Sequence, residues 1–536
     1  MKNRTVLIGL DGATFTILDT LIEQGIMPFI QQFIKTGVRS ELISIIPPLT
    51  PPAWTSLMTG RNPGAHGIFD FFQKEKTSHR LRFTTHQDVQ AETIWQIASR
   101  AGHRVTTLNF PLMLPPPSIT GNVISGGWLT ARQLPLACYP SDLFHRIKAL
   151  PGFNAKELAL DMSHEEKALE GCRQDEFRSW IQLHIRRERQ WFNILKNRMQ
   201  KDPCGLEAIL FDGIDKIQHL CWTYLTADSA CQQLEPWQMH VRELCVKYFF
   251  KLDQILAEIA ELAGPDATIV MVSDHGFGPQ RETFFVNTWL ERNGYLKWAD
   301  NDSPWRSPTG ILGMGEMAKH IYKIDWAHTV AYASTPSSNG IHIVKQGPEH
   351  PNGIAPGAYE SMCNELTQNL KRILSPTTGE PLIACIWPRE KAFSGAHMDS
   401  APDLTLLLRD GGLVSILSSD DIVKPLSTVK GSHRMEGIFL AKGPAIESSF
   451  ERDSISILDI APILLHTLNI PIPSEMEGCI PENLFTSAYL ERCPIRKSNA
   501  SQTYRVANDH APIKQVFDTE AEAKMAEKLR ALGYIE

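Results

Sequence analysis

The sequence has little of what marks several classes of protein. Its 536 residues carry a formal net charge of -7 and show no basic stripe, which argues against bulk electrostatic binding of nucleic acid. None of its 10 cysteines stands in a CxxC pair, and their spacing matches neither a zinc ribbon nor a dense disulfide framework. We therefore expect reduced thiols, most of them buried, in a reducing compartment.

Export and membrane signals are also missing. The apolar run before Asp11 is short and lacks the features of a secretory signal. No window reaches the roughly 18 apolar residues that a membrane span needs. Low-complexity linkers and internal repeats are absent as well. These features predict a cytoplasmic protein without a membrane span.

What the sequence does contain is an alternation of short apolar runs and helical stretches. The stretches "TVLIGL", "GLEAILFDGID" and "ATIVMVSDHGFG" are each typical of a buried strand that ends in a polar turn or loop. Residues 21–37 and 246–264 have the apolar spacing of helices. Strands that alternate with helices predict an α/β fold with a mostly parallel sheet.

Two stretches break this alternation. Residues 138–200 look mainly helical, and residues 301–399 carry Trp, Pro and Gly without clean periodicity. We therefore expect a discontinuous α/β core in residues 1–137, 201–300 and 400–485, with a helical cap in 138–200 and a second, substrate-covering insertion in 301–399. Residues 486–536 are expected to form a C-terminal extension with an amphipathic terminal helix. The charge run Arg186–Arg189 is expected to be a solvated helix face.

Acidic residues follow the predicted strands. Asp11 follows "VLIGL", Asp212 and Asp215 follow "AILF", and Asp274 follows "IVMVS". One aspartate at a strand end is usually a turn or cap residue. The carboxyl ends of parallel strands, however, meet at one edge of a sheet, where ligands bind. Aspartates after three such strands therefore indicate a site.

Histidines accompany these aspartates. Asp215 and His219 are four residues apart, so on a helix they share one face. His275 directly follows Asp274, and His433 precedes a predicted strand. Asp and His without clustered Cys suit zinc, manganese or iron. Such a set suggests two neighbouring metals, which favour phosphoryl transfer because its barrier falls with positioning and charge neutralisation.

The stretch "IPPLTPPAWTSLMTG" supplies hydroxyl groups for such chemistry. Thr50, Thr55 and Thr59 lie within it. A threonine hydroxyl is a weak nucleophile unless a base or a metal lowers its pKa. Pro51 disfavours helical geometry at Thr50, and Pro51 and Pro52 suit the first turn of a helix. Thr50 is therefore expected at the N-cap, where the positive end of the helix dipole lies behind its hydroxyl.

Taken together, these stretches resemble the alkaline phosphatase superfamily, in its type I phosphodiesterase/nucleotide pyrophosphatase branch with bacterial phosphohydrolase/phosphomutase-like members. The resemblance covers most of the chain and is carried, in the family's order, by "VLIGLDG", "TPPAWTSLMTGRNPGAHGIFDF", "FDGIDKIQH", "VSDHGFGP", "GSHRMEGIFLAKGP" and "SISILDIAPILLHTLNIPIPSEMEG". It implies a three-layer α/β/α core with a mostly parallel sheet and inserted cap segments.

The resemblance also implies roles for single residues. Thr50 matches the family's nucleophile, whereas Thr55, Thr59 and His66 match structural positions. Two divalent ions are implied, zinc first and manganese as an alternative. The ligands of one metal would be Asp11, Asp274 and His275, and those of the other Asp215, His219 and His433.

The nucleotide pyrophosphatases place an Asn three residues after the nucleophile to help hold a phosphate oxygen, and this chain has Ala53 there. Substitutes for that Asn are a backbone N–H at the start of the helix, Lys216, Asn339 or Arg434.

The expected function is that of a metal-dependent phosphohydrolase. It would cleave a small phosphodiester or phosphomonoester substrate through a phospho-threonine intermediate. A phosphotransferase or phosphomutase on the same site is the alternative within enzymes. A non-catalytic binding protein that retains the fold is the alternative outside them. Sulfate ester hydrolysis is disfavoured, because the sulfatase branch uses a modified Cys or Ser at the nucleophile position.

Overall fold

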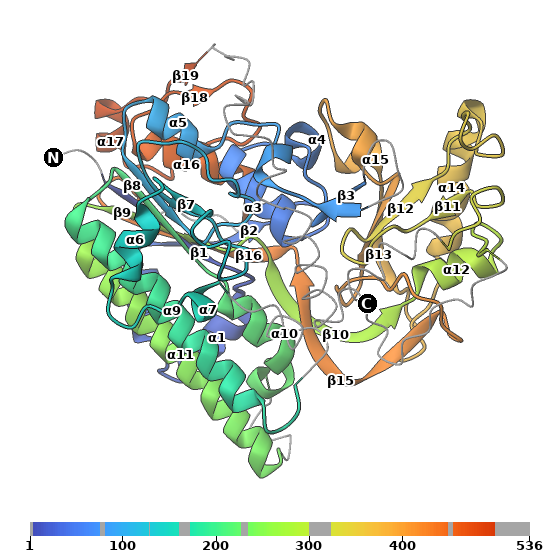
Figure 1. The fold of residues 1–536 in the computed structure, drawn as a ribbon, viewed down its shortest axis with the longest axis horizontal. Coiled ribbons are helices and arrows are strands. Elements are labelled where there is room, and N and C mark those ends of the chain that lie inside the picture. Colours follow the sequence, from blue (N-terminus) through green and yellow to red (C-terminus); the bar gives the residue numbers. More distant parts are fainter. Residues whose placement is uncertain are drawn as a thin grey trace. The chain divides into compact units, whose positions relative to one another are not determined.

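The computed structural model describes residues 4–74, 81–127, 129–159, 172–226, 234–299, 323–448 and 454–498. They divide into two compact units (Figure 1). Unit 1 takes its described residues from 4–68, 85–277 and 433–498, and unit 2 from 69–74, 81–84, 278–299 and 323–432. The expected terminal amphipathic helix lies outside the described residues. The cap roles of residues 138–200 and 301–399 stay predictions.

Within its described residues, unit 1 is built on a nine-stranded sheet. The strand order is β17 (Ser454–Ser456), β2 (Val38–Ile43), β16 (Glu436–Lys442), β9 (Thr268–Val272), β1 (Thr5–Leu10), β8 (Leu206–Phe211), β5 (Val105–Leu108), β6 (Gly121–Ile124) and β7 (Cys138–Tyr139). The run from β9 to β6 is parallel. Strand β16 is antiparallel to both of its neighbours, and β7 to β6. The mostly parallel α/β sheet predicted from the sequence is confirmed.

Helices cover both faces of this sheet (Figure 1). One face carries α1 (Phe15–Glu23), α2 (Pro28–Thr36), α9 (Phe177–Lys201), α10 (Gly213–Thr226) and α11 (Pro236–Ala263), and the other carries α3 (Thr50–Thr59), α5 (Ile94–Arg100) and α16 (Ile460–Thr467). Because helices exclude water from both faces, β1, β8 and β9 are buried along their whole length. This is the three-layer arrangement that the resemblance implied.

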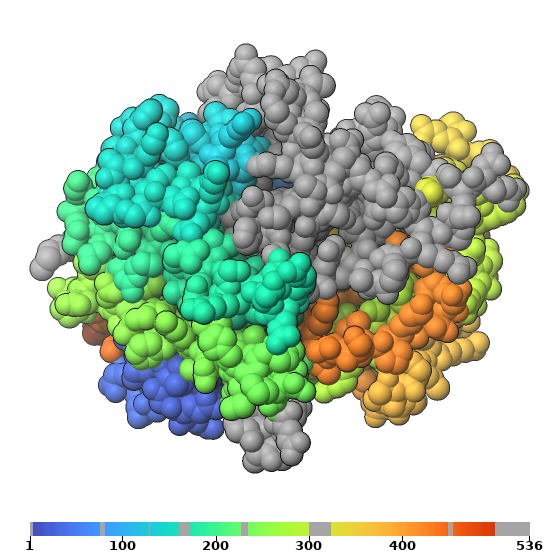
Figure 2. Space-filling model, turned by 60° about the horizontal axis from the view of Figure 1, so that its bottom comes forward, coloured from blue at the N-terminus to red at the C-terminus, as the bar shows by residue number. Residues whose placement is uncertain are grey.

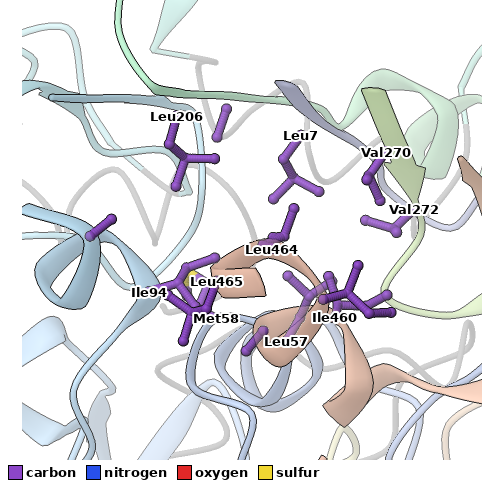
Figure 3. Packing of buried hydrophobic residues seen from close by; sticks show 14 of the residues in the cluster. Leu7, Leu57, Met58, Ile94, Leu206, Val270, Val272, Ile460, Leu464 and Leu465 are labelled. Atoms are coloured by element: carbon purple, nitrogen blue, oxygen red, sulfur yellow. The ribbon is translucent and has the colours of Figure 1, made fainter. Parts of the chain in front are cut away.

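The apolar core of unit 1 lies between the sheet and the second helix layer. Figure 3 shows Leu7, Leu206, Val270 and Val272 of the strands facing the side chains of α3, α5 and α16. On the opposite face, Asp253 of α11 accepts the backbone N–H groups of Phe29 and Ile30, each at 3.0 Å. These groups begin α2, so the carboxylate caps that helix. Figure 2 shows the blue segment of α1 and α2 beside the green segment of α11.

Unit 2 contains an antiparallel four-stranded sheet in the order β11 (Ala331–Tyr332), β12 (Gly340–Ile343), β14 (Leu404–Leu408) and β13 (Ile383–Pro388). The strand predicted at "DLTLLL" is β14, which therefore belongs to this sheet. Helices α12 (Val286–Arg292), α14 (Tyr359–Leu370) and α15 (Arg389–Ala392) and the hairpin of β3 (Phe72–Lys74) and β4 (Leu81–Phe83) complete the unit. Strands β10 (Gly276–Phe284) and β15 (Val423–Arg434) pair and carry the chain across the boundary of the units.

Smaller elements of unit 1 are α4 (Pro63–His66), α6 (Leu143–Lys148), α7 (Ala155–Leu158), α17 (Ser487–Arg492), β18 (Ile472–Pro473) and β19 (Lys497–Ser498). Among the helices that the structure describes, none combines the length and apolarity needed to cross a membrane.

The expectation of a solvated helix face at Arg186–Arg189 is wrong for its two middle residues. Arg187 and Glu188 of α9 are buried, with 1% and 2% of their surface exposed. Arg187 pairs with Asp212. Arg186 and Arg189 reach the surface and pair with Glu157 and Glu258. Four consecutive residues span a full helical turn of 3.6 residues, so they point in all directions and cannot share one face.

Candidate metal centre and nucleophile

The three predicted aspartates converge at the carboxyl ends of neighbouring strands in unit 1. Strand β1 lies between β8 and β9, with Leu10 opposite Phe211 and Gly9 opposite Val272. Asp11 directly follows β1. Asp274 comes two residues after the end of β9, and Asp215 lies in the first turn of α10, after β8. The register of the parallel strands thus aligns the three carboxylates at one edge.

Three histidines meet these carboxylates. Asp215 Oδ1 lies 3.3 Å from His219 Nε2 and 3.4 Å from His433 Nε2, and the two Nε2 atoms are 3.1 Å apart. His275 Nε2 lies 3.3 Å from Asp274 Oδ2 and 3.7 Å from Asp11 Oδ1. The structure therefore brings together the six residues proposed as metal ligands.

These residues form one continuous centre with two overlapping groups. Ligand atoms of Asp11, Asp274 and His275 all lie within 4.8 Å of one another, and so do those of Asp215, His275 and His433. The rings of His275 and His433 stack, with centroids 3.7 Å apart and planes inclined by 19°. His275 thus stands between the two predicted sets.

Each carboxylate uses one oxygen to hold itself in place. Asp11 Oδ2 accepts the indole N–H of Trp54 at 3.3 Å, Asp274 Oδ1 accepts the Gly12 N–H at 3.1 Å, and Asp215 Oδ2 accepts the Lys216 ammonium at 3.1 Å. The other oxygens, Asp11 Oδ1, Asp274 Oδ2 and Asp215 Oδ1, are buried and lack a hydrogen bond of normal geometry within the described structure. Buried acceptors in this state are costly.

The imidazoles point lone pairs at these oxygens. His433 Nδ1 lies 2.9 Å from Pro48 O, and His275 Nδ1 lies 3.1 Å from Gly276 O. A carbonyl oxygen only accepts, so each Nδ1 carries a hydrogen, and in the neutral form of such a ring the lone pair lies on Nε2. A lone pair that faces an ionised carboxylate oxygen repels it unless a proton or a metal cation lies between the two. The donor set therefore fits divalent cations, with the backbone contacts fixing the rings as outer-shell partners do.

The charges at the centre favour the same conclusion. Burial, together with the charges of Asp274 and Asp215, raises the pKa of Asp11 well above its ordinary value. Burial raises the pKa of Asp274 to about 8 and lowers that of His275 well below its usual range. Burial also opposes ionisation of Asp215, but His219 and Lys216 outweigh it and lower its pKa. Cations in the centre would displace protons from Asp11 and Asp274.

Of the three threonines of α3, only Thr50 faces this centre. Its Oγ1 lies 3.3 Å from His275 Nε2. Thr55 and Thr59 donate to Pro51 O and Thr55 O, each at 2.7 Å. The helix begins at Thr50 itself and Leu49 is the N-cap, so the expectation of Thr50 as N-cap was one residue off. The two prolines fit the second and third helical positions, which lets the first turn include Thr50.

The family follows from a comparison with known protein families. The model described as type I phosphodiesterase / nucleotide pyrophosphatase matches residues 5–434. The chain belongs to this family. The type I phosphodiesterase/nucleotide pyrophosphatase branch inferred from the sequence is therefore confirmed, and so is the expectation of a phosphoric ester hydrolase. No curated protein matches the chain in sequence.

The chain is also similar in fold to solved structures of other proteins. Phosphonoacetate hydrolase from Sinorhizobium meliloti 1021 in complex with phosphonoformate gives a TM-score of 0.52 at 15% identity, over 87% of this chain and 96% of that one. The complex with phosphonoacetate gives 0.50 at 16%, with the same coverage. Murine ectonucleotide pyrophosphatase / phosphodiesterase 5 gives 0.48 at 16%, over 90% of this chain and 100% of that one.

The residues suggested as phosphate contacts of this phosphodiesterase family member lie in different places. Lys216 and Arg434 belong to unit 1, where Lys216 bonds Asp215 and Arg434 donates to His433 O at 3.0 Å. Asn339 belongs to unit 2, where its side chain bonds Gly412 O and the Val414 N–H, each at 3.0 Å. Ala53 is fully buried in the apolar core.

The backbone substitute suggested for the missing Asn is not available directly after Thr50. Pro51 and Pro52 have no N–H group. The N–H of Ala53 already donates to Leu49 O at 2.9 Å. None of the three residues that follow Thr50 therefore has a backbone N–H left to donate to a phosphate oxygen.

Sequence reasoning missed the residues that shape the centre from behind. Trp54 holds the carboxylate of Asp11, and Gly12 holds that of Asp274. Gly12 has a φ of 65°, a value that favours glycine. The Phe277 ring lies 4.7 Å from His219, 5.4 Å from His433 and 5.9 Å from His275, measured between centroids. The Gly after Asp11 and the Phe two residues after His275 were the only signals in the sequence.

His66 occupies a position away from the centre. It is fully buried, its Nδ1 accepts the Ile68 N–H at 3.2 Å, and its Nε2 lies 2.9 Å from Ser56 Oγ. An Nδ1 that accepts leaves the hydrogen on Nε2, which donates to Ser56. His66 thereby ties α4 to α3.

Proposed function

We propose that this protein is a metal-dependent phosphohydrolase that cleaves phosphodiester or phosphomonoester bonds through phospho-Thr50. The observation that carries the proposal is the set of buried carboxylate oxygens without hydrogen bonds, facing imidazole lone pairs beside one threonine hydroxyl. Asp11, Asp274 and His275 would hold one divalent cation, and Asp215, His219 and His433 the other. Zinc suits this mixed Asp and His set best, and manganese is the alternative.

The chemistry then follows from Thr50. Divalent cations, when bound, lower the pKa of a nearby hydroxyl and neutralise charge on phosphoryl oxygens. The Thr50 oxygen gives up its proton to solvent water and forms a bond to phosphorus while the ester P–O bond breaks. The departing oxygen takes up a proton from water. Water next attacks the phosphothreonine, the bond to Thr50 breaks, its oxygen regains a proton, and phosphate or a phosphomonoester leaves.

The position of Thr50 supports this role. It is the first residue of α3, a helix of 10 residues, so the positive end of the helix dipole favours the ionised oxygen. Lys216 and Arg434 are the candidates in unit 1 for contacting a phosphate oxygen.

The test uses the full chain, reconstituted with zinc or manganese, on paired aryl phosphate monoesters and diesters. Thr50→Val retains the side-chain shape and removes the hydroxyl, and we expect turnover to fall by about 10³-fold or more. Thr55→Val is the matched control on the same helix, and Thr50→Ser should restore part of the activity. Wild-type turnover in Thr50→Val on every substrate would exclude the covalent mechanism.

Two further measurements test the alternatives. Products formed with an added alcohol acceptor distinguish phosphoryl transfer from hydrolysis. A wild-type chain that holds no metal would favour a binding protein.

We also propose that the protein acts in a reducing, cytoplasmic compartment. All nine cysteines within the described residues are free thiols, and five of them are buried in unit 1 or unit 2 without a disulfide. Free thiols persist where disulfides are reduced.

A further inference from the structure

Trp54 links the nucleophile helix to a carboxylate of the centre. It lies four residues after Thr50 on α3, so both side chains occupy one face of the helix. The residue is fully buried. Its indole N–H donates to Asp11 Oδ2 at 3.3 Å. Helix α3 therefore touches the centre twice, through Thr50 at His275 and through Trp54 at Asp11.

Packing fixes the indole ring in this position. On one side it lies against β1 at Gly9, where an added Cβ would come within 2.7 Å of the ring. On another side the ring of Phe110 packs edge-on, with centroids 5.3 Å apart and planes at 85°. The ring has little room to turn, so the direction of its N–H is set by the core and not by Asp11.

The contact decides which oxygen of Asp11 serves the centre. Oδ2 is held by Trp54, and Oδ1 is left buried and facing His275 Nε2. We propose that Trp54 is a positioning residue, which orients Asp11 for cation binding and fixes the distance between the metal centre and Thr50. This inference rests on the proposed function, because it assumes that Asp11 holds a cation.

A purely structural role would need only the bulk of the ring, so the two roles separate when the N–H alone is removed. Trp54→Phe keeps an aromatic side chain without the donor. The matched control is Trp95→Phe. Trp95 is also fully buried in the same core, packs on Phe110 with centroids 5.2 Å apart, and donates to Met58 Sδ at 3.3 Å instead of to the centre.

The experiment titrates the metal-free full chains with zinc, by calorimetry, and with cobalt(II), by its visible absorption. Loss of an outer-shell partner typically lowers metal affinity by about 10- to 100-fold. We expect a loss of this size in one of the two binding steps for Trp54→Phe, because Asp11 belongs to one ligand set. Trp95→Phe should bind both ions as the wild type does. Thermal unfolding of the metal-free variants should show losses of similar size.

The outcomes separate the two proposals. Equal cobalt and zinc affinities for Trp54→Phe and Trp95→Phe would overturn the role of Trp54 even where the wild type binds two ions. A wild-type chain that binds no metal would overturn the proposed function first. If Trp54→Phe fails to fold, benzothienylalanine at position 54 provides the second variant, since it replaces the N–H by sulfur and preserves the shape. Wild-type affinity in that variant would also refute the proposal.

Discussion

Each carboxylate of the centre divides its two oxygens between the scaffold and the site. Asp274 shows this most clearly, because Gly12 N–H holds Oδ1 while Oδ2 lies buried beside His275. The side chain is fully buried, and burial raises its pKa to about 8. Without a cation this residue is a cost to the folded state, and with one it becomes a ligand. One residue thus has opposite effects on stability in the two forms.

The effect of Asp274→Asn on the melting temperature should have opposite signs without metal and with metal. The amide retains an oxygen for the Gly12 N–H and removes the charge. In chelator at pH 9 we expect a higher melting temperature than wild type, since a buried charge near Asp11 and Asp215 is gone. With zinc we expect a lower one, and a loss of at least about 100-fold in one binding step. Thermal scans and zinc calorimetry measure both.

Asp253→Asn is the control for this prediction. Asp253 is also a buried carboxylate, but it caps α2 through Phe29 and Ile30. We expect Asp253→Asn to lower the melting temperature by the same amount with and without zinc. If Asp274→Asn behaves like Asp253→Asn, Asp274 is only a structural residue.

At the scale of elements, helix α10 is held at its start by a residue of another helix. Glu188 Oε1 of α9 accepts the Gly213 N–H at 2.8 Å and the Tyr248 hydroxyl at 2.9 Å. Gly213 leaves room for this contact, since a Cβ there would lie 2.4 Å from Glu188 Oε1. Because α10 carries Asp215 and His219, the buried glutamate helps to set the position of both.

The stability of unit 1 should depend on the protonation of Glu188. Burial, with the charge of Asp212, raises its pKa to about 8, whereas an unfolded Glu titrates near about 4.3. The folded state therefore binds the extra proton, and stability falls as pH rises from about 4 to about 8. Glu188→Gln keeps the acceptor and cannot ionise. Urea unfolding at pH 5, 7 and 9 should show similar stability at pH 5 and a more stable variant at pH 9. Parallel pH profiles would contradict this.

Sequence patterns predicted local features of these elements well. Asp11, Asp215 and Asp274 were placed because apolar runs mark strands and the ends of parallel strands meet. The contact of Glu188 with Gly213, 25 residues away, and the ring of Trp54 at Asp11 had no such signal. Both depend on which helix packs over which strand end, and this is decided by the whole core rather than by spacing along the chain.

At the scale of the whole molecule, we expect bound metal to stabilise unit 1 and to leave the stability of unit 2 unchanged. The six residues proposed as ligands all belong to unit 1, and the four-stranded sheet of β11 to β14 belongs to unit 2. Ligand binding stabilises the structure that holds the ligand. We expect zinc to slow amide exchange in β1, β9 and the start of α10, and to leave β12 and β14 unchanged. Exchange measured by mass spectrometry with zinc and with chelator tests this, and equal protection of both units would contradict it.

The chain leaves unit 1 for the second time after Phe277, just beyond His275, and returns to it at His433. The rings of these two histidines stack with centroids 3.7 Å apart, so the two ends of the intervening segment emerge side by side. Joining neighbouring ends costs little more for a long segment than for a short one, because loop-closure entropy grows only slowly with length. We therefore expect a short linker in place of residues 278–432 to leave the proposed ligands of unit 1 in position, with residues 69–74 and 81–84 as the remaining described part of unit 2.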